Sequence, residues 1–369
     1  MNFSMFMPVD IRTGIGCVEA NAECFAIGRH AFLVTGRHAA KACGAQEDVI
    51  RVLRALGIAY TVYDQIGENP LMSVCWEGGQ MAAGVGADMV IGIGGGSAMD
   101  AAKAIAAYAA NPSMEPRALM TENRPAAALP IILIPTTAGT GSEANPYAIL
   151  TLDGDDKKWT FKDPNQTYAK YAFLDARYTA SLSEKYTVSC ALDAFAHCAE
   201  SYLSPKANDV SRMFAAYGAR ALYAFIRDFE AGGDISSLET RERLLYASCA
   251  GGIAINMTGT GFPHPLGYNL TLMRGVPHGA ACGAFYRHYL DFCERGDAAL
   301  CRALYDAIGA AGEEIKTVIP MRSNVRLVLD DGEIARYVEK VRGASNYKNC
   351  PYVITPEEMV QIYTELFGE

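Results

Sequence analysis

The feature that most constrains the fold is a change of pattern near residue 182. Before it, apolar runs of strand length alternate with stretches of helical periodicity. The strand-like runs lie at 31–35, 58–63, 89–93, 131–134 and 171–174, with helical stretches at 39–56 and 71–84. Regular alternation of strands and helices is typical of a parallel sheet with crossover helices. Residues 146–170 mix alternating apolar residues with charges and turn formers, which predicts an antiparallel excursion.

After residue 182 the pattern becomes helical. Ala- and Leu-rich stretches at helical spacing cover 188–203, 209–229, 237–257 and 282–311. Apolar residues at this spacing predict helices that each bury one face. A Ser-containing helix start falls in residues 179–184, so we place a domain boundary there. We expect an α/β domain with a parallel sheet at residues 1–182 and an all-α domain at residues 183–369.

Composition excludes several classes of function. The formal net charge is −9, and no cluster of Lys and Arg offers a surface to nucleic acid or anionic membrane. Apolar stretches such as 101–110 and 126–135 are shorter than the roughly 20 residues of a membrane helix. The N-terminus lacks a signal-peptide pattern, and eleven cysteines without CxxC pairs fit structural thiols in a reducing compartment. We expect a soluble cytoplasmic enzyme without nucleic-acid or membrane partners.

A glycine-rich loop follows the strand at 89–93 and precedes a helix at 101–110. Its glycines, Gly94, Gly95 and Gly96, let the backbone approach a pyrophosphate closely, with Ser97 beside them. A helix N-terminus also presents unpaired N–H groups to an anion. The alternative is a glycine-rich turn that binds nothing.

A second loop, rich in hydroxyl groups, follows the strand at 131–134. Side chains that could hydrogen-bond phosphate, ribose or carboxamide are Thr136, Thr137, Thr140 and Ser142, although they would also suit an ordinary capped turn. Open α/β sheets bind ligands at the carboxyl ends of their strands. The two loops together therefore predict a nucleotide or dinucleotide site in a Rossmann-like domain.

The end of the first predicted strand bears on the choice of dinucleotide. Folds selective for NAD commonly place a carboxylate there, which accepts a hydrogen bond from the ribose 2′-hydroxyl. Binding of NADP requires that this carboxylate be absent. Here the chain reads Gly36-Arg37-His38, and Arg37 could meet a 2′-phosphate. We therefore favour NADP(H) over NAD(H). In the alternative interpretation Arg37 is a solvated residue at a helix start.

Four residues form a possible metal-binding set. Asp193 and His197 stand four apart, so they share one face of a helix, and His264 and His278 follow downstream. One carboxylate and three imidazoles suit a divalent ion such as Fe²⁺, Zn²⁺, Co²⁺ or Mn²⁺. Each histidine alone would more simply be structural, so the prediction rests on the set.

Several motifs together resemble one family, the iron-containing, or group III, alcohol dehydrogenases. The resemblance extends from about residue 32 to residue 367 and is carried by segments 94–103, 135–143, 193–197, 263–267 and 277–279. It implies a dehydroquinate synthase-like architecture, with a dinucleotide-binding domain, a helical domain and a catalytic cleft between them, in a homodimer.

The resemblance also assigns residues. Asp193, His197, His264 and His278 match the four metal ligands of the family, with Fe²⁺ or Zn²⁺ as the expected ion. The positions that match its cofactor contacts are Gly36, Asn69, Gly95, Gly96, Ser97, Asp100, Thr136, Thr137, Thr140, Lys158 and Thr179. One position departs from the family: Tyr268 replaces a histidine that many members carry near the nicotinamide. A phenol with a reference pKa near 10 is poorly suited to relay protons at neutral pH.

The expected reaction is hydride transfer between the nicotinamide C4 and a primary alcohol or aldehyde, with the divalent ion polarising the substrate oxygen. Two enzyme alternatives share the implied architecture: a zinc polyol dehydrogenase of the glycerol type and a dehydroquinate-synthase-like lyase. A catalytically silent nucleotide-binding or filament-forming protein is the alternative from another class. Loss of divalent-ion binding would favour the silent protein.

Overall fold

The structure is a computed structural model that describes residues 3–120, 125–155, 157–229 and 234–369. The chain divides into two compact units. The sheet unit comprises Phe6–Leu182 with Ser236–Leu245, and the helical unit comprises Met1–Met5, Ser183–Ile235 and Tyr246–Glu369. Each unit is described by itself.

A parallel sheet of six strands forms the centre of the sheet unit, which confirms the predicted α/β fold. In spatial order the strands are β1 (Asp10–Thr13), β8 (Tyr171–Leu174), β5 (Ile131–Pro135), β4 (Met89–Gly94), β2 (His30–Thr35) and β3 (Ala59–Tyr63). Every pairing between neighbours is parallel. The sequence prediction missed β1, because this short edge strand is mostly polar and largely exposed.

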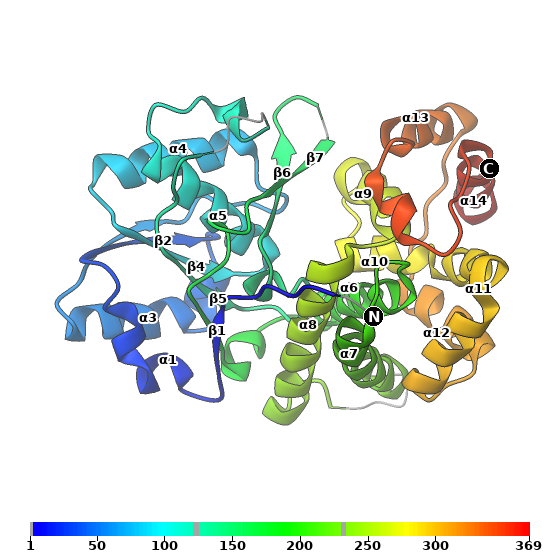
Figure 1. Cartoon of the computed structure of the whole chain (residues 1–369), viewed down its shortest axis with the longest axis horizontal. Coiled ribbons are helices and arrows are strands. Elements are labelled where there is room, and N and C mark those ends of the chain that lie inside the picture. Colours follow the sequence, from blue (N-terminus) through cyan, green and yellow to red (C-terminus); the bar gives the residue numbers. More distant parts are fainter. Residues whose placement is uncertain (1–2, 121–124, 156, 230–233) are drawn as a thin grey trace. The chain divides into compact units, whose positions relative to one another are not determined.

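Helices cover both faces of this sheet (Figure 1). On one face lie α1 (Cys17–Ala20) and α3 (Ala45–Ala55), and on the other lie α4 (Met72–Gly84) and α5 (Gly96–Ala110). Side chains alternate along β2, so Ala31 and Leu33 join the core under α3. The single helix predicted at 39–56 is interrupted, because Gly44 adopts a left-handed φ of 83° between α2 (Ala39–Ala42) and α3.

The predicted antiparallel excursion is a two-stranded hairpin of β6 (Tyr147–Leu152) and β7 (Lys157–Lys162). Residue 156 between them lies outside the described residues. Short 3-10 helices complete the described elements: η1 (Ala22–Phe25), η2 (Pro116–Met120), η3 (Ser142–Ala144) and η4 (Ala176–Thr179) in this unit, and η6 (Ser345–Asn349) in the other.

The helical unit confirms the predicted change to helices. Its elements are α6 (Glu184–Leu203), α7 (Asp209–Asp228), the part of α8 (Leu238–Thr258) from Tyr246 onward, α9 (Pro263–Arg274), α10 (His278–Ala284), α11 (Tyr286–Ile308), α12 (Gly312–Ser323), α13 (Asp331–Val341) and α14 (Pro356–Phe367). Beyond residue 182, the first helix of this unit is α6, which follows its N-cap residue Ser183. The stretch predicted as one helix at 282–311 is two, because the chain turns at Phe285 between α10 and α11.

Helix α9 was not predicted, because two prolines stand in its first turn. Pro263 occupies the first helical position, where the missing N–H costs no hydrogen bond. Among the described residues, no helix is long and apolar enough to cross a membrane.

Candidate metal and cofactor sites

Asp193 and His197 share one face of α6. They are one helical turn apart, and both are buried, at 4% and 6% exposure. The Nε2 atom of His197 lies 3.8 Å from Oδ1 of Asp193. Helical spacing alone therefore brings these two side chains together, as predicted from the sequence.

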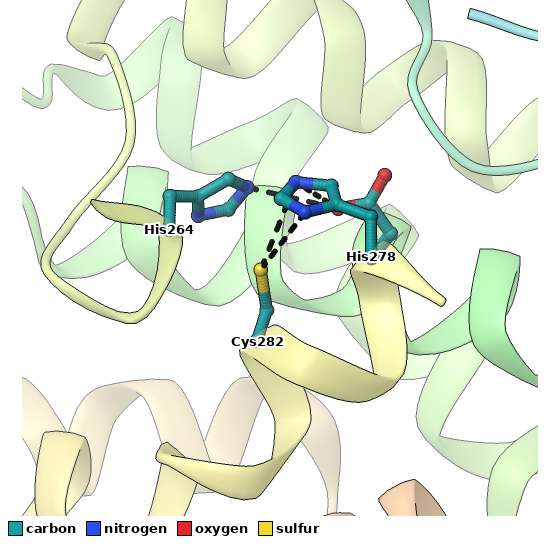
Figure 2. A group of neighbouring side chains, drawn as sticks. His264, His278 and Cys282 are labelled. Atoms are coloured by element: carbon teal, nitrogen blue, oxygen red, sulfur yellow. Dashed lines mark hydrogen bonds and ion pairs between the residues drawn. The ribbon is translucent and has the colours of Figure 1, made fainter. Parts of the chain in front are cut away.

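Two further imidazoles approach the same carboxylate oxygen from other helices. His264 stands in the first turn of α9, and His278 is the first residue of α10. The Nε2 atom of each lies 3.7 Å from Oδ1 of Asp193. Three helices thus place three ring nitrogens at similar distances around one oxygen, and Figure 2 shows His264 and His278 pointing toward each other.

Close packing of α10 on α6 holds His278 against Asp193. A Cβ atom at Gly279 would lie 1.8 Å from the carbonyl oxygen of Ser189 and 2.7 Å from the backbone nitrogen of Asp193. No side chain fits in that space, so the close approach of the two helices depends on a glycine beside the histidine.

Glu200 orients His264 from the other side of its ring. Its Oε2 atom lies 2.8 Å from Nδ1 of His264 and also accepts a hydrogen bond from the backbone N–H of Gly261. A carboxylate only accepts, so the ring donates from Nδ1 and directs Nε2 toward Asp193. The sequence analysis missed Glu200, although its position one turn after His197 on α6 was a usable signal.

The electrostatics of the cluster favour an added cation. Burial alone would raise the pKa of Asp193, but His197, His278 and His264 together hold that pKa well below its usual range. Burial would lower the pKa of His264, yet Glu200 and then Asp193 outweigh it and raise the pKa to about 9. Two fully buried carboxylates therefore make the space between the rings attractive to positive charge.

Oδ1 of Asp193 and Nε2 of His264 are among the buried atoms of this cluster that lack hydrogen-bond partners within the part of the chain that the structure describes. Unpaired buried polar atoms are costly, and here both are good ligands for a borderline divalent ion. The residues present therefore fit such an ion.

A sulfur atom also lies close to these ligand atoms. Ligand atoms of Asp193, His264, His278 and Cys282 all lie within 4.8 Å of one another, whereas His197 is not in that set. Cys282 follows His278 by four residues, so both side chains lie on one face of α10.

Tyr268 lies beside the cluster. Its half-buried ring stacks on the ring of His278, with centroids 5.5 Å apart and an angle of 24° between the planes. This is the position at which the resembled family often carries a histidine.

In the sheet unit, the two predicted loops lie directly against each other. β4 and β5 are parallel neighbours, and the N–H of Thr136 donates to the carbonyl oxygen of Gly94. A Cβ atom at Gly96 would lie 2.6 Å from Cγ2 of Thr140, and one at Gly95 would lie 3.2 Å from Thr137. The glycine loop also enters its helix earlier than predicted, because α5 begins at Gly96 rather than near residue 101.

Other predicted cofactor residues lie near the same strand ends. Asn69 has a left-handed φ of 54°, and its N–H donates to Oγ of Ser97 at 3.3 Å. Gly36 follows β2, and a Cβ atom there would lie 3.3 Å from the carbonyl oxygen of Ile66. Arg37 is exposed beside it.

Two of the predicted residues belong to a buried network instead of an open surface. Asp100 accepts hydrogen bonds from Oγ of Ser142 at 2.6 Å and from the N–H of Ile149 at 2.9 Å. Lys103, fully buried on α5, donates to both the carbonyl oxygen and Oγ of Ser142 and to the carbonyl oxygen of Tyr147. These contacts fix the second loop onto α5.

Burial changes the titration of this network. It lowers the pKa of Lys103 to about 8, although Asp100 and Glu143 oppose the shift. It raises the pKa of Glu143 to about 7 and also raises that of Asp100. Of the two other predicted contacts, Lys158 on β7 acts electrostatically on Asp100 and opposes the rise in its pKa, whereas the buried Thr179 in η4 donates to the carbonyl oxygen of Ala176.

Comparison with known proteins covers most of the chain. Residues 8–176 match the model of a family described as iron-containing alcohol dehydrogenase, and residues 187–323 match the C-terminal model of the Fe-containing alcohol dehydrogenase family. The sulfoacetaldehyde reductase of Bilophila wadsworthia is 32% identical over 285 residues, covering 76% of this chain and 72% of that protein. The long-chain primary alcohol dehydrogenase AdhA of Thermoanaerobacter ethanolicus is 32% identical over 68% of this chain and 63% of its own length.

Two solved structures superpose on nearly the whole length of this chain. An iron-containing alcohol dehydrogenase from Thermotoga maritima superposes with a TM-score of 0.91 at 30% identity, covering 99% of both chains. A sulfoacetaldehyde reductase from Bifidobacterium kashiwanohense, solved in complex with NAD⁺, superposes with a TM-score of 0.86 at 25% identity over 99% of both chains.

Proposed function

The chain belongs to the iron-containing alcohol dehydrogenase family, and on that premise we propose that its catalytic ion is held by Asp193, His197, His264 and His278. The predicted resemblance is confirmed, and the chain is an oxidoreductase of alcohols and aldehydes that depends on a divalent metal and a nicotinamide cofactor. The ligand residues, the cofactor residues and the choice between NADP and NAD are our proposals.

One observation carries the ligand assignment. Three imidazole Nε2 atoms lie 3.7 to 3.8 Å from a single buried carboxylate oxygen, which itself has no hydrogen-bond partner among the described residues. A divalent ion in this position acts as a Lewis acid that polarises the substrate oxygen.

The residues of this chain supply orientation and exclusion of water. Glu200 fixes the ring of His264, and the packing of α10 on α6 fixes His278. Asp193 and His264 are buried, which strengthens electrostatic interactions between those two side chains.

We propose the sheet unit as the dinucleotide-binding domain and the helical unit as the metal-binding domain, with the boundary after residue 182. The cofactor phosphates would meet the backbone of Gly94, Gly95 and Gly96 at the start of α5. The hydroxyls of Thr137 and Thr140 stand against that loop. Cytoplasmic location stays a prediction from the N-terminal pattern and the cysteines, and a homodimer stays a prediction from the resemblance.

We propose NADP(H) as the preferred cofactor. Gly36 presents no carboxylate at the end of β2, and the exposed guanidinium of Arg37 is a charged donor fork suited to a 2′-phosphate. The relative solved with NAD⁺ makes preference for NADH the alternative result.

The test uses protein reconstituted with Fe²⁺ or Zn²⁺, one aldehyde and both reduced cofactors. Wild type should prefer NADPH in kcat/KM by about tenfold to a hundredfold, because charge-assisted hydrogen bonds contribute about 1.5–3 kcal/mol each. Gly36→Asp should reverse the preference, mainly through KM. Gly36→Ala is the matched control, because its Cβ meets the same carbonyl oxygen of Ile66 without adding charge.

Two results would count against these assignments. A wild type that prefers NADH, or a Gly36→Asp variant with an unchanged ratio, would remove the 2′-phosphate site from the end of β2. Turnover that is independent of divalent-ion content would show that the ion takes no part in the reaction. Because the relatives differ in the aldehydes and alcohols of their names, the aldehyde is best chosen from a screen across chain lengths and polar substituents.

A further inference from the structure

An ion pair stands at the strand ends that carry Gly36 and Arg37. Lys41 lies on α2, and its Nζ atom is 2.8 Å from Oδ2 of Asp64. Asp64 is the first residue after β3, just as Gly36 is the first residue after β2. Two opposite charges thus meet where the two strands end.

The pairing of β2 with β3 places this ion pair beside the end of β2. The two strands are parallel, and Val34 is the register partner of Tyr63, so the residues that follow them leave the sheet at one edge. Just beyond the strands, the N–H of Ile66 donates to the carbonyl oxygen of Thr35 at 3.3 Å. The ion pair therefore lies at the same edge of the sheet as the proposed 2′-phosphate site.

We propose that Lys41 is a second cation of the 2′-phosphate site, and that its ammonium leaves Asp64 for the phosphate when NADP(H) binds. The inference rests on the proposed function, since it assumes that the 2′-phosphate lies at the end of β2. It adds to Arg37 a second residue that determines cofactor specificity. With NAD(H), which carries a hydroxyl in place of the phosphate, Lys41 stays paired with Asp64.

The charge of the phosphate needs more than one cation. A phosphate monoester carries about −1.5 to −2 charges near pH 7. The exposed guanidinium of Arg37 supplies one positive charge, and Gly36 beside it supplies none. The ammonium of Lys41 raises the positive charge at the site to two, which matches that of the ligand.

Little opposes the exchange of partners. The side chain of Lys41 is 50% exposed and that of Asp64 is 31% exposed. Ion pairs this accessible to water contribute little to stability, and the flexible stem of lysine lets its ammonium move between neighbouring oxygens. After the exchange, Asp64 keeps the hydrogen bond that Gln65 donates to its other carboxylate oxygen at 2.8 Å.

Lys103, in the same unit, is a contrast. It is fully buried, and its Nζ atom donates to three oxygens at 2.6 to 2.8 Å. Its ammonium cannot turn to a ligand without leaving buried acceptors unpaired, which is costly. Lys41 has one exposed partner instead, so its ammonium is available to a phosphate.

Binding of two nucleotides to the full chain tests the inference without turnover. Adenosine 2′,5′-bisphosphate carries the 2′-phosphate, and adenosine 5′-monophosphate lacks it. Isothermal titration calorimetry gives both dissociation constants, and the wild type should bind the bisphosphate about tenfold or more tightly. Lys41→Met, which keeps the apolar stem and removes the charge, should reduce this ratio by about tenfold, the scale of one charge-assisted hydrogen bond.

A double variant separates phosphate binding from a simpler effect. Loss of Lys41 also leaves the carboxylate of Asp64 without its cation, and that charge would repel a phosphate by itself. If Lys41 binds the phosphate, Lys41→Met combined with Asp64→Asn should bind the bisphosphate about tenfold more weakly than Asp64→Asn alone. Arg54→Met is the matched control and should keep the wild-type ratio, because the exposed Arg54 donates to Tyr60 near the opposite end of β3.

The outcomes distinguish the inference from the proposed function. A ratio that Lys41→Met leaves unchanged, or a double variant that binds the bisphosphate as tightly as Asp64→Asn, would overturn the inference and leave the 2′-phosphate to Arg37. A wild type that binds both nucleotides equally would overturn the proposed preference for NADP(H). Retained binding of the monophosphate shows that a variant is folded at this site, and Lys41→Gln replaces Lys41→Met if that binding is lost.

Discussion

Each unit of the molecule contains a buried cluster of charged groups, and the two clusters balance their charge differently. In the sheet unit, Asp100 and Glu143 share their surroundings with Lys103, whose Nζ atom lies 3.7 Å from Asp100 and donates to Ser142 and Tyr147. This cluster contains its own cation. Its hydrogen bonds fix the second loop, so it supports the predicted cofactor site as a structural element.

In the helical unit, the ionic contacts of Asp193 within the described part of the chain are with imidazoles alone. A second buried carboxylate, Glu200, faces the far side of one of those rings. Buried charges are tolerated when they are paired or bind a metal. A buried cluster with its own lysine carries its own positive charge, whereas a buried cluster of carboxylates and imidazoles without one is suited to receive a cation.

The largest expected effect is at a ligand. His264→Ala should lose stoichiometric metal and more than about a hundredfold of turnover, because removing a ligand costs more than a change in the groups behind the ligands. His288→Ala is the control, since that histidine pairs with Glu365 on the surface of the same unit. Metal content by elemental analysis and turnover should be measured together. Full metal content and activity in His264→Ala would place the ion elsewhere.

The next largest effect is expected on metal affinity when Glu200 is replaced. Glu200→Gln keeps the shape of the side chain but removes the charge behind His264, so metal affinity should fall by about 10–100-fold. Glu365→Gln alters a carboxylate–histidine pair of this unit that lies outside the metal cluster, and it should leave the metal affinity unchanged. The readout is the metal dissociation constant by competition with a chelator, alongside the melting temperature of the metal-free protein. A shift in melting temperature without a change in affinity would make Glu200 only structural.

Sequence periodicity predicted the parts of this molecule that depend on local spacing. The buried strands, the change to helices after residue 182 and the shared face of Asp193 and His197 are all consequences of periods of 2.0 and 3.6 residues. The approach of His264 and His278 to that face depends on the packing of α10 on α6 and of α9 on α10, which no sequence periodicity encodes. The assignment of His264 and His278 as ligands was instead predicted from the family resemblance.

What the sequence left undecided depends on three-dimensional neighbours. Asp100 and Ser142 match a cofactor motif, but only the structure shows that their polar atoms bond to each other. The same holds for Glu200, a common residue type whose role depends on the ring nitrogen of His264 beside it. The edge strand β1 was missed because its polar residues contribute no apolar pattern.

A pH measurement tests whether the cluster of the sheet unit is complete in itself. Burial raises the pKa of Glu143 to about 7 from an unfolded value of 4.5, so the folded state holds a proton that the unfolded state loses between those values. Its contribution to stability is therefore present below pH 4.5 and is lost as pH rises through 7. Glu143→Gln should match wild type near pH 5 and exceed its stability by about 1–2 kcal/mol at pH 8.

Chemical denaturation across this pH range, with metal-free protein, gives both stability curves. Glu77→Gln, a change at an exposed carboxylate of the same unit, should run parallel to wild type at every pH. If the Glu143→Gln curve also runs parallel, Glu143 is ionised throughout, and Lys103 compensates two carboxylates instead of one.

The smallest expected effect is at Tyr268, at the edge of the metal cluster. Its ring stacks on His278 at 5.5 Å, and Tyr268→Phe keeps that ring while removing the hydroxyl. If the side chain acts by packing, kcat should stay within a few-fold of wild type, since a general acid would cost about 10²–10⁴-fold. Tyr268→Ala, which removes the stacking ring as well, should lower both metal affinity and kcat further than Tyr268→Phe. A loss above about a hundredfold in Tyr268→Phe with unchanged metal content would instead assign the hydroxyl a role in proton transfer, in place of the histidine that many relatives carry there.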